Sequence, residues 1–140
     1  YLENNIRFRV IGDLSKFSKS LQNRILKTQE LTSSCNGLTQ VLALNYGSKD
    51  EIIRAIKKLN EKGLEVSEKN LESCLDTAGI SPVDIMIRTS GEVRLSNYLL
   101  WQNAYAEMFF VQTYWPDFTK TELDDIISDF SRRERRFGAV

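Results

Sequence analysis

The chain has 140 residues, of which 41% are hydrophobic and 27% charged, and its 19 basic and 19 acidic residues cancel. This length is enough for one domain and too short for two ordinary ones. A net charge of zero gives no global attraction to nucleic acid or to an anionic membrane. The sequence contains no histidine, which excludes imidazole triads, imidazole-ligated zinc and imidazole acid–base catalysis from these residues.

The apolar runs, the start of the chain and the cysteines bear on membrane insertion, secretion and redox state. No apolar run reaches the length of a membrane span, and no signal peptide is visible. Cys35 and Cys74 are far apart and lack metal-ligand spacing, so we predict free thiols in a reducing compartment. The chain begins at Tyr1 without an initiator methionine, which indicates a removed leader or an internal fragment.

The first third of the chain predicts a strand, a helix and a second strand. Residues 6–11 alternate apolar and basic side chains, the pattern of a half-exposed or edge strand. Apolar residues at helical spacing predict a helix from about Ser18 to Ser33, closed by the turn signal Asn36-Gly37. The apolar run 38–44 predicts a buried strand of a parallel sheet.

Two helices follow. Ser48-Lys-Asp-Glu51 has the spacing of a capping box, in which serine and glutamate each bind the other's backbone amide. The helix that it opens is predicted to end at Gly63, where a C-cap glycine would stand. Ser67 predicts the start of a shorter helix.

The next segment combines a strand, a polar loop and an apolar run. Residues 84–87 predict a short strand, and Ser96 or Asn97 is placed to cap a helix that extends through Glu107. Met108 to Val111 is predicted to continue as strand.

A second capping box, Thr119-Lys-Thr-Glu122, predicts the last helix, which Gly138 ends. Its acids fall early and its arginines late, which suits the helix dipole. Strands that alternate with helices predict an α/β domain with a largely parallel sheet flanked by helices.

Arg88, Arg94 and Ser96 form the first candidate site. Arg88 ends a predicted strand and the other two lie on the loop after it, where ligands of open α/β sheets bind. Arginine suits bidentate recognition of phosphate, and the amides of a following helix would add donors. Two solvated arginines and a capping serine explain the same spacing, and the spacing leaves both interpretations open.

Glu107 interrupts an apolar run, where a buried carboxylate is costly unless it is paired or binds a metal. A magnesium ion held by one or two carboxylates and by substrate phosphates would fit beside the arginine loop. The other interpretation is a structural partner for an arginine, or a side chain in water, and the spacing favours this second interpretation. The basic tail 132–138 is likewise read as the end of a capped helix rather than as a phosphate site.

Two further features are weaker. Asn45-Tyr46-Gly47 follows an apolar strand and precedes a helix, which suits a loop facing a ligand but also any such turn. The aromatic residues of the second half are explained by core packing or by a subunit interface. These are Trp101, Tyr105, Phe109, Phe110, Trp115 and Phe118.

Several ordered motifs together resemble one family. Ile87–Gln102, Tyr105-Ala-Glu107 and Trp115-Pro-Asp-Phe118 closely resemble the C-terminal signature of cis-prenyltransferases, and the bacterial undecaprenyl diphosphate synthases are the nearest match. Further matching motifs occupy residues 8–13, 42–47 and 132–138.

The resemblance implies roles for individual residues. Arg88, Arg94 and Ser96 would hold the diphosphate of isopentenyl diphosphate, and Leu95 would line the same loop. Glu107 would be a Mg²⁺ ligand. The tail with Arg136 and Gly138 would approach the active site near the interface of a homodimer, which the aromatic segment would help to form.

The resemblance also implies a reaction and a setting. Isopentenyl diphosphate would be condensed onto an allylic diphosphate, such as farnesyl diphosphate, to give a long polyprenyl diphosphate for the carrier lipid of cell-wall peptidoglycan. The enzyme would act in the cytoplasm, at most at the inner face of the membrane, without nucleic acid.

Two departures from the family matter. The family's Asp-Gly-Asn motif, which supplies a catalytic carboxylate and the allylic diphosphate loop, does not occur here, and Ser48-Lys49 stands where many members have Gly-Arg. We therefore expect residues 1–140 to be the C-terminal part of a larger single-domain enzyme, with no catalytic residue of its own and no activity alone. The alternative is a non-catalytic interaction subunit of a heteromeric prenyltransferase. An Asp-Gly-Asn motif before Tyr1 would favour the enzyme.

Overall fold

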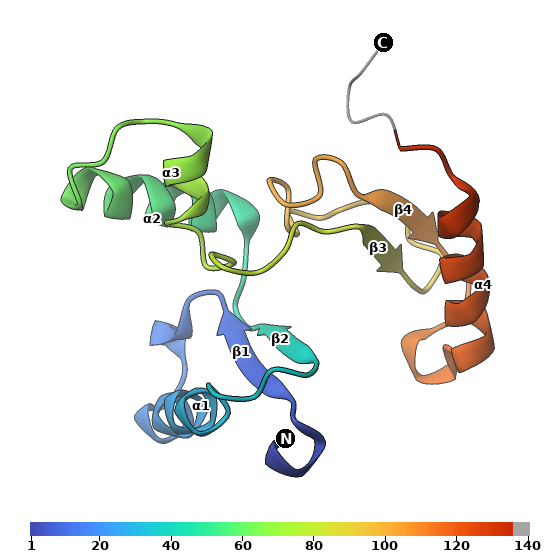
Figure 1. Ribbon diagram of the computed structural model, residues 1–140, viewed down its shortest axis with the longest axis horizontal. Helices are drawn as coiled ribbons and strands as arrows, with labels where there is room; N and C mark the ends of the chain where they lie inside the picture. The colour runs from blue at the N-terminus through green and yellow to red at the C-terminus, as the bar shows by residue number, and fades with distance from the viewer. Residues whose placement is uncertain (136–140) are drawn as a thin grey trace. The chain divides into compact units, whose positions relative to one another are not determined.

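The computed structural model describes residues 1–135. The chain divides into two compact units, Tyr1–Ile80 and Ser81–Val140, and each is described by itself (Figure 1). Parallel strands and helices make up both units, which confirms the predicted α/β class. Among the described residues, no helix is long and apolar enough to cross a membrane. The prediction of a single domain portion stays a prediction.

The first unit is a parallel strand pair with helices. Strands β1 and β2 run in parallel, with Arg7 opposite Thr39 and Ile11 opposite Ala43. The elements are the 3₁₀ turns η1 (Leu2–Asn4) and η2 (Leu14–Lys16), strands β1 (Arg7–Ile11) and β2 (Thr39–Ala43), and helices α1 (Lys19–Leu31), α2 (Ser48–Glu61) and α3 (Glu68–Glu72).

A small apolar core holds this unit together. Its buried side chains come from β1, from α1 and α2 and from the turn after α3: Phe8, Ile11, Ile25, Ala55, Leu59, Cys74 and Leu75. Cys35 and Cys74 are both buried free thiols, as predicted. Gly12 follows β1 with φ of +106°, and a Cβ there would lie 2.1 Å from the Leu44 carbonyl oxygen. Only glycine therefore fits where β1 passes the end of β2.

The strand 38–44 was predicted to be buried, and this was wrong for the unit described. Thr39, Gln40 and Leu42 of β2 are exposed, and its other residues are half-buried. In the described residues β1 is the only strand that pairs with β2. An apolar sequence run therefore does not by itself say how many neighbours a strand has.

Three helix signals are confirmed. The Ser18 hydroxyl accepts from the Leu21 amide at the start of α1, and Ser67 caps α3 in the same way through Asn70. Gly63 follows the C-cap of α2 with φ of +61°, and its N–H donates to the Asn60 carbonyl at 3.0 Å. This is the left-handed residue that commonly ends a helix.

The prediction of a capping box from Ser48 to Glu51 was wrong. Helix α2 has Gly47 as its N-cap, without a side-chain cap, and Ser48 is already its first residue. Glu51 is fully buried and binds other groups. Its Oε1 accepts from the Asp76 amide at 2.9 Å and its Oε2 from the Tyr46 hydroxyl at 2.5 Å. The Tyr46 hydroxyl and the Asp76 amide therefore bind the Glu51 carboxylate in place of the Ser48 amide.

In its described residues, 81–135, the second unit pairs two short parallel strands with one helix. Its elements are β3 (Ile85–Arg88), β4 (Glu107–Phe110), the 3₁₀ turn η3 (Trp115–Asp117) and α4 (Lys120–Arg132). The C-terminal end of α4 contacts β4, since Arg133 forms an ion pair with Glu107 and lies over the Phe109 ring. The predicted capping box of α4 is confirmed, because Thr119 and Glu122 each accept from the other's backbone amide.

The helix predicted from residue 96 through Glu107 was wrong. Residues 89–106 form turns and loop, and Glu107 begins β4 instead of ending a helix. Ser96, Asn97 and Leu99 have φ of 49°, 62° and 46°. A right-handed helix cannot continue through left-handed residues.

Candidate functional site

The carboxyl end of β3 brings the predicted phosphate-binding residues together. Arg88 is the last residue of β3 and is half-buried. Its Nη1 donates to the Ser96 hydroxyl at 3.3 Å and to the Arg94 backbone carbonyl. A guanidinium and a hydroxyl that are eight residues apart in sequence therefore meet at this strand end.

The loop after Arg88 is fixed by the segment that follows β4. The N–H groups of Ser90 and Gly91 donate to the carbonyls of Thr113 and Val111, both at 2.9 Å. Gly91 has φ of +68°, and a Cβ there would lie 2.6 Å from the Gln112 side-chain oxygen. The start of the loop is thus held by backbone pairing, and its left-handed φ at Gly91 favours glycine.

Arg94 and Leu95 are placed differently from Arg88. The Arg94 guanidinium forms an ion pair with Glu92 and is 58% exposed, so only its backbone carbonyl contacts Arg88. Leu95 is half-buried in the same loop. Only Nη1 of Arg94 is paired with Glu92, which leaves the other N–H groups of its guanidinium for a phosphate.

Glu107 has an arginine partner. Its Oε2 accepts from Nη1 of Arg133 at 2.7 Å, and its own N–H donates to the Asp84 carbonyl at 2.9 Å. The arginine partner that the structural interpretation expects is therefore present. The role as a Mg²⁺ ligand stays a prediction.

Glu107 and the Arg88 loop lie at opposite ends of the strand pair. The register sets Glu107 opposite Ile85 and Phe110 opposite Arg88. Three residues of strand are about 10 Å long. Within the described residues, no hydrogen bond or ion pair joins Glu107 to Arg88, Arg94 or Ser96. A diphosphate at Arg88 and a cation at Glu107 would thus be neighbouring rather than superimposed.

Arg133, the C-cap residue of α4, is held from several sides. Its Nε and Nη2 donate to Oδ2 of Asp129 at 3.2 and 2.8 Å, and its guanidinium lies 4.2 Å from the centre of the Phe109 ring. The hydrogen bonds to Glu107 and Asp129 raise the pKa of Arg133 above its usual value. The sequence offered no local signal for this pairing, since Arg133 and Glu107 are 26 residues apart.

A divalent cation needs several oxygen ligands. In residues 1–135 no group of three or more His, Cys, Asp or Glu side chains is placed to hold a metal ion. Mg²⁺ usually keeps several waters and takes one or two carboxylates together with phosphate oxygens. A single carboxylate such as that of Glu107 meets this requirement only together with phosphate oxygens, water or further protein ligands.

The basic tail was predicted to be the end of a capped helix. Arg132 ends α4 and lies 3.7 Å from Asp129, and Arg135 forms an ion pair with Asp84 at 2.6 Å. Arg135 also lies over the Phe130 ring at 5.5 Å. Arg136 and Gly138, predicted to approach a dimer interface, lie outside the described residues.

The first unit contains a polar network that sequence reasoning missed. The Asp76 carboxylate accepts from Nη1 and Nη2 of Arg54, both at 2.7 Å, and from the Gly12 amide at 3.0 Å. Tyr46 donates to the buried Glu51, and burial, with help from Glu51, raises the pKa of its hydroxyl above the usual range. The loop Asn45-Tyr46-Gly47 is therefore held by packing within its unit.

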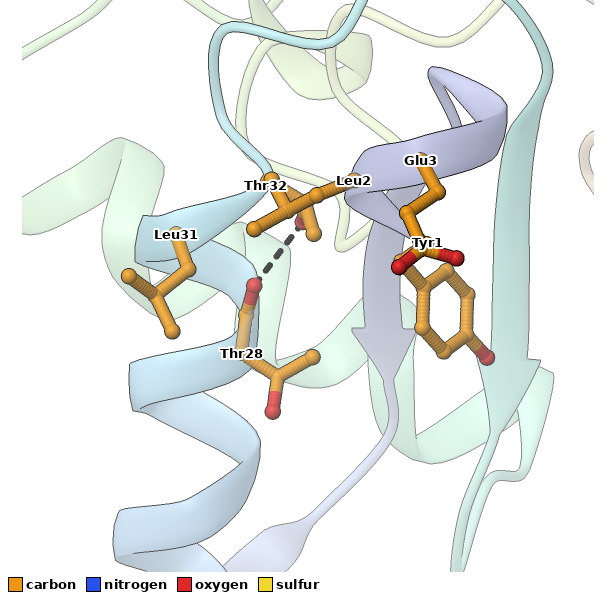
Figure 2. Close-up of a pocket in the computed structure, with 6 residues that line it drawn as sticks. All are labelled: Tyr1, Leu2, Glu3, Thr28, Leu31 and Thr32. Carbon is orange, nitrogen blue, oxygen red and sulfur yellow. Dashed lines mark hydrogen bonds between the residues drawn. The ribbon is translucent and has the colours of Figure 1, made fainter.

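The first unit also has an open surface pocket of about 380 Å³. Figure 2 shows its lining, which is Tyr1, Leu2, Glu3, Thr28, Leu31 and Thr32. The Thr32 hydroxyl donates to the Thr28 carbonyl at 2.8 Å, so its proton is already used at the end of α1. The lining contains no arginine or lysine side chain and none of the predicted site residues, so it does not suit a diphosphate.

Comparison with known proteins gives consistent matches. A family model described as putative undecaprenyl diphosphate synthase matches residues 1–138. An isoprenyl transferase of Wolinella succinogenes is 61% identical over 140 residues, which are all of this chain and 61% of the relative. A Vibrio vulnificus protein named ditrans,polycis-undecaprenyl-diphosphate synthase, farnesyl-diphosphate specific, is 43% identical over 145 residues, with 99% of this chain and 58% of the relative covered.

A solved structure is also similar to this chain. The crystal structure of a probable undecaprenyl diphosphate synthase from Campylobacter jejuni has a TM-score of 0.92 and 46% identity, over 99% of this chain and 65% of that one. This chain spans about three-fifths of the length of the curated relatives that it matches.

Proposed function

Because the chain belongs to the undecaprenyl diphosphate synthase family, whose model matches residues 1–138, we propose that the whole protein is a cis-prenyltransferase. Its substrates are isopentenyl diphosphate and an allylic diphosphate such as farnesyl diphosphate. Its product is a long polyprenyl diphosphate that serves as carrier lipid in cell-wall peptidoglycan synthesis. The name of the Vibrio vulnificus relative supports this choice of substrate and product.

The reaction is a head-to-tail condensation. The bond between the terminal allylic carbon and its diphosphate oxygen breaks, and the isopentenyl double bond supplies the electron pair of the new carbon–carbon bond. A proton then leaves the isopentenyl unit, which gives a cis double bond and free pyrophosphate. Since the chain has no histidine, no imidazole of residues 1–140 accepts that proton.

The Arg88 loop is the proposed site for the isopentenyl diphosphate. The observation that carries this assignment is the meeting of Arg88 and Ser96, 3.3 Å apart, at the carboxyl end of β3. Arg88 binds phosphate oxygens, Ser96 donates a further hydrogen bond, and Arg94 adds N–H donors of its guanidinium. Leu95, half-buried in this loop, lines the site beside the diphosphate.

Mg²⁺ is the proposed cofactor, and Glu107 is the residue of this chain that would hold it. When bound, the cation stabilises the negative charge that develops on the departing pyrophosphate. The distance of about 10 Å along the strand pair between Glu107 and Arg88 suits two different diphosphates, the allylic one near the cation and the isopentenyl one at the arginine loop.

The proposal includes the oligomeric state and the cellular location of the enzyme. A cis-prenyltransferase of this type works as a homodimer in the cytoplasm, near the inner face of the membrane that receives its product. The exposed aromatic side chains Tyr105 and Trp115, 61% and 72% exposed in the structure, support an interface in the second unit. The tail with Arg136 and Gly138 belongs to the same proposed interface.

Arg88→Ala in the whole protein tests the substrate assignment. Loss of a charge-assisted hydrogen bond to phosphate costs about 1.5–3 kcal/mol, so the Michaelis constant for isopentenyl diphosphate should rise roughly 10- to 100-fold. Steady-state kinetics with the allylic substrate held at saturation measures this rise.

Arg24→Ala is the matched control, since Arg24 is an exposed arginine of α1 outside the proposed site. It should leave the Michaelis constant unchanged. An Arg88→Ala protein with the wild-type constant would overturn the assignment of the loop.

A further inference from the structure

The two oxygens of Glu107 are not equivalent. Oε2 accepts from Nη1 of Arg133 at 2.7 Å, whereas no described residue donates to Oε1. We propose that Arg133 is a positioning residue, which fixes Glu107 through Oε2 and thereby turns Oε1 toward a bound divalent cation. The inference rests on the proposed function, because it takes Glu107 as the cation ligand.

Contacts other than the one with Glu107 also hold the Arg133 guanidinium. Asp129 accepts from both Nε and Nη2, and the Phe109 ring lies 4.2 Å below the guanidinium. A planar guanidinium held on one edge and one face has few remaining orientations. Its remaining nitrogen, Nη1, is the one that points at Glu107.

Glu107 needs such a partner because its backbone alone does not fix its carboxylate. Its N–H is held by the Asp84 carbonyl at 2.9 Å, but the side chain has three rotatable bonds beyond that point. The side chain is 27% exposed, so an unpaired carboxylate would turn toward solvent. The ion pair removes that freedom on folding, before any cation binds.

The cluster around Glu107 carries no net positive charge. Arg133 lies between two carboxylates, Glu107 and Asp129, so these three side chains carry a net charge of −1. Arg132 also approaches Asp129, at 3.7 Å, but it is 74% exposed and well screened by solvent. Residues that hydrogen-bond a ligating carboxylate typically raise metal affinity 10- to 100-fold.

Direct binding of Mn²⁺ to the whole protein tests this role without measuring turnover. Electron paramagnetic resonance of free Mn²⁺ gives the dissociation constant. Arg133→Gln should weaken Mn²⁺ binding by roughly tenfold or more, since the carboxylate loses its support. Arg132→Gln removes the same charge from the neighbouring position without touching Glu107, and it should leave the constant unchanged.

Glu107→Gln separates the inference from the proposed function. If Glu107→Gln weakens Mn²⁺ binding and Arg133→Gln leaves it equal or tighter, Arg133 has no positioning role and the proposed function stands. If Glu107→Gln itself changes nothing, both the cation assignment and this inference fail.

Asp129→Asn covers the case in which Arg133→Gln does not fold. It weakens the anchor of Arg133 at a residue whose side chain is 44% exposed, and it keeps the ion pair with Glu107. An intermediate loss of Mn²⁺ affinity supports the proposal, and an unchanged affinity contradicts it. The unfolding midpoint of each variant shows that the fold is intact.

Discussion

Asp76 connects three segments of the first unit through its carboxylate. Burial alone raises its pKa, but the hydrogen bonds from Arg54 and from the Gly12 amide outweigh burial, and its pKa lies below the usual value. A carboxyl whose pKa is depressed by folding stabilises the protein above its unfolded-state pKa, about 3.9. That stability is lost as the pH falls through the folded-state pKa.

Asp76→Asn should therefore lower the free energy of unfolding at pH 7 by about 1.5–3 kcal/mol, the range for hydrogen bonds to charged groups. The difference from wild type should shrink below about pH 4, because the wild-type carboxyl is then itself becoming protonated. Urea unfolding at pH 7, 5 and 3 measures it. Glu61→Gln, an exposed acid at the end of α2, is the control. A difference that stays constant down to pH 3 would contradict the charge-based account.

The sequence predicts some contacts between residues and not others. Arg88 and Ser96 could be found because polar residues directly after a strand are a local signal, and they do meet. The pairs Arg54–Asp76 and Arg133–Glu107 could not, because they are 22 and 26 residues apart and depend on how elements pack. Local patterns report the loop, while the partners of a charge are set by tertiary structure.

Among the elements, α4 owes its start to a complete capping box. The Thr119 hydroxyl accepts from the Glu122 amide at 3.2 Å, and Glu122 accepts from the Thr119 amide at 2.9 Å. Thr119→Ala should lower the free energy of unfolding by about 0.5–2 kcal/mol. Thr121→Ala, an exposed change within the same first turn, should be neutral or slightly stabilising, because alanine is the better helix former. Equal urea midpoints for the two variants would contradict the cap.

The same motif, Ser48 to Glu51, fails at α2, and a helix predicted across 96–107 is absent. In the first case the Tyr46 hydroxyl and the Asp76 amide donate hydrogen bonds to the Glu51 carboxylate. In the second, left-handed residues interrupt an apolar run and β4 pairs with β3 instead. Helix ends and short helices are decided by such competing contacts, so the α/β class was predictable and these boundaries were not.

For the whole molecule, two observations bear on what residues 1–140 can do. They contain no Asp-Gly-Asn motif, to which the cis-prenyltransferase resemblance assigns ionisation of the allylic diphosphate. They do carry the Arg88 loop, which is held within the second unit by its own backbone pairing. Binding of the isopentenyl substrate and chain elongation should therefore be separable.

We predict that residues 1–140 alone bind isopentenyl diphosphate but do not elongate farnesyl diphosphate in the presence of Mg²⁺. Calorimetry should give a dissociation constant that Arg88→Ala raises roughly 10- to 100-fold, while labelled isopentenyl diphosphate yields no extracted polyprenyl product. The whole protein, assayed in parallel, is the positive control for elongation, and circular dichroism checks that the shorter chain is folded. Mg²⁺-dependent product from residues 1–140 would show that they contain both halves of the site. Absence of binding by a folded chain would instead remove the Arg88 loop as the isopentenyl site.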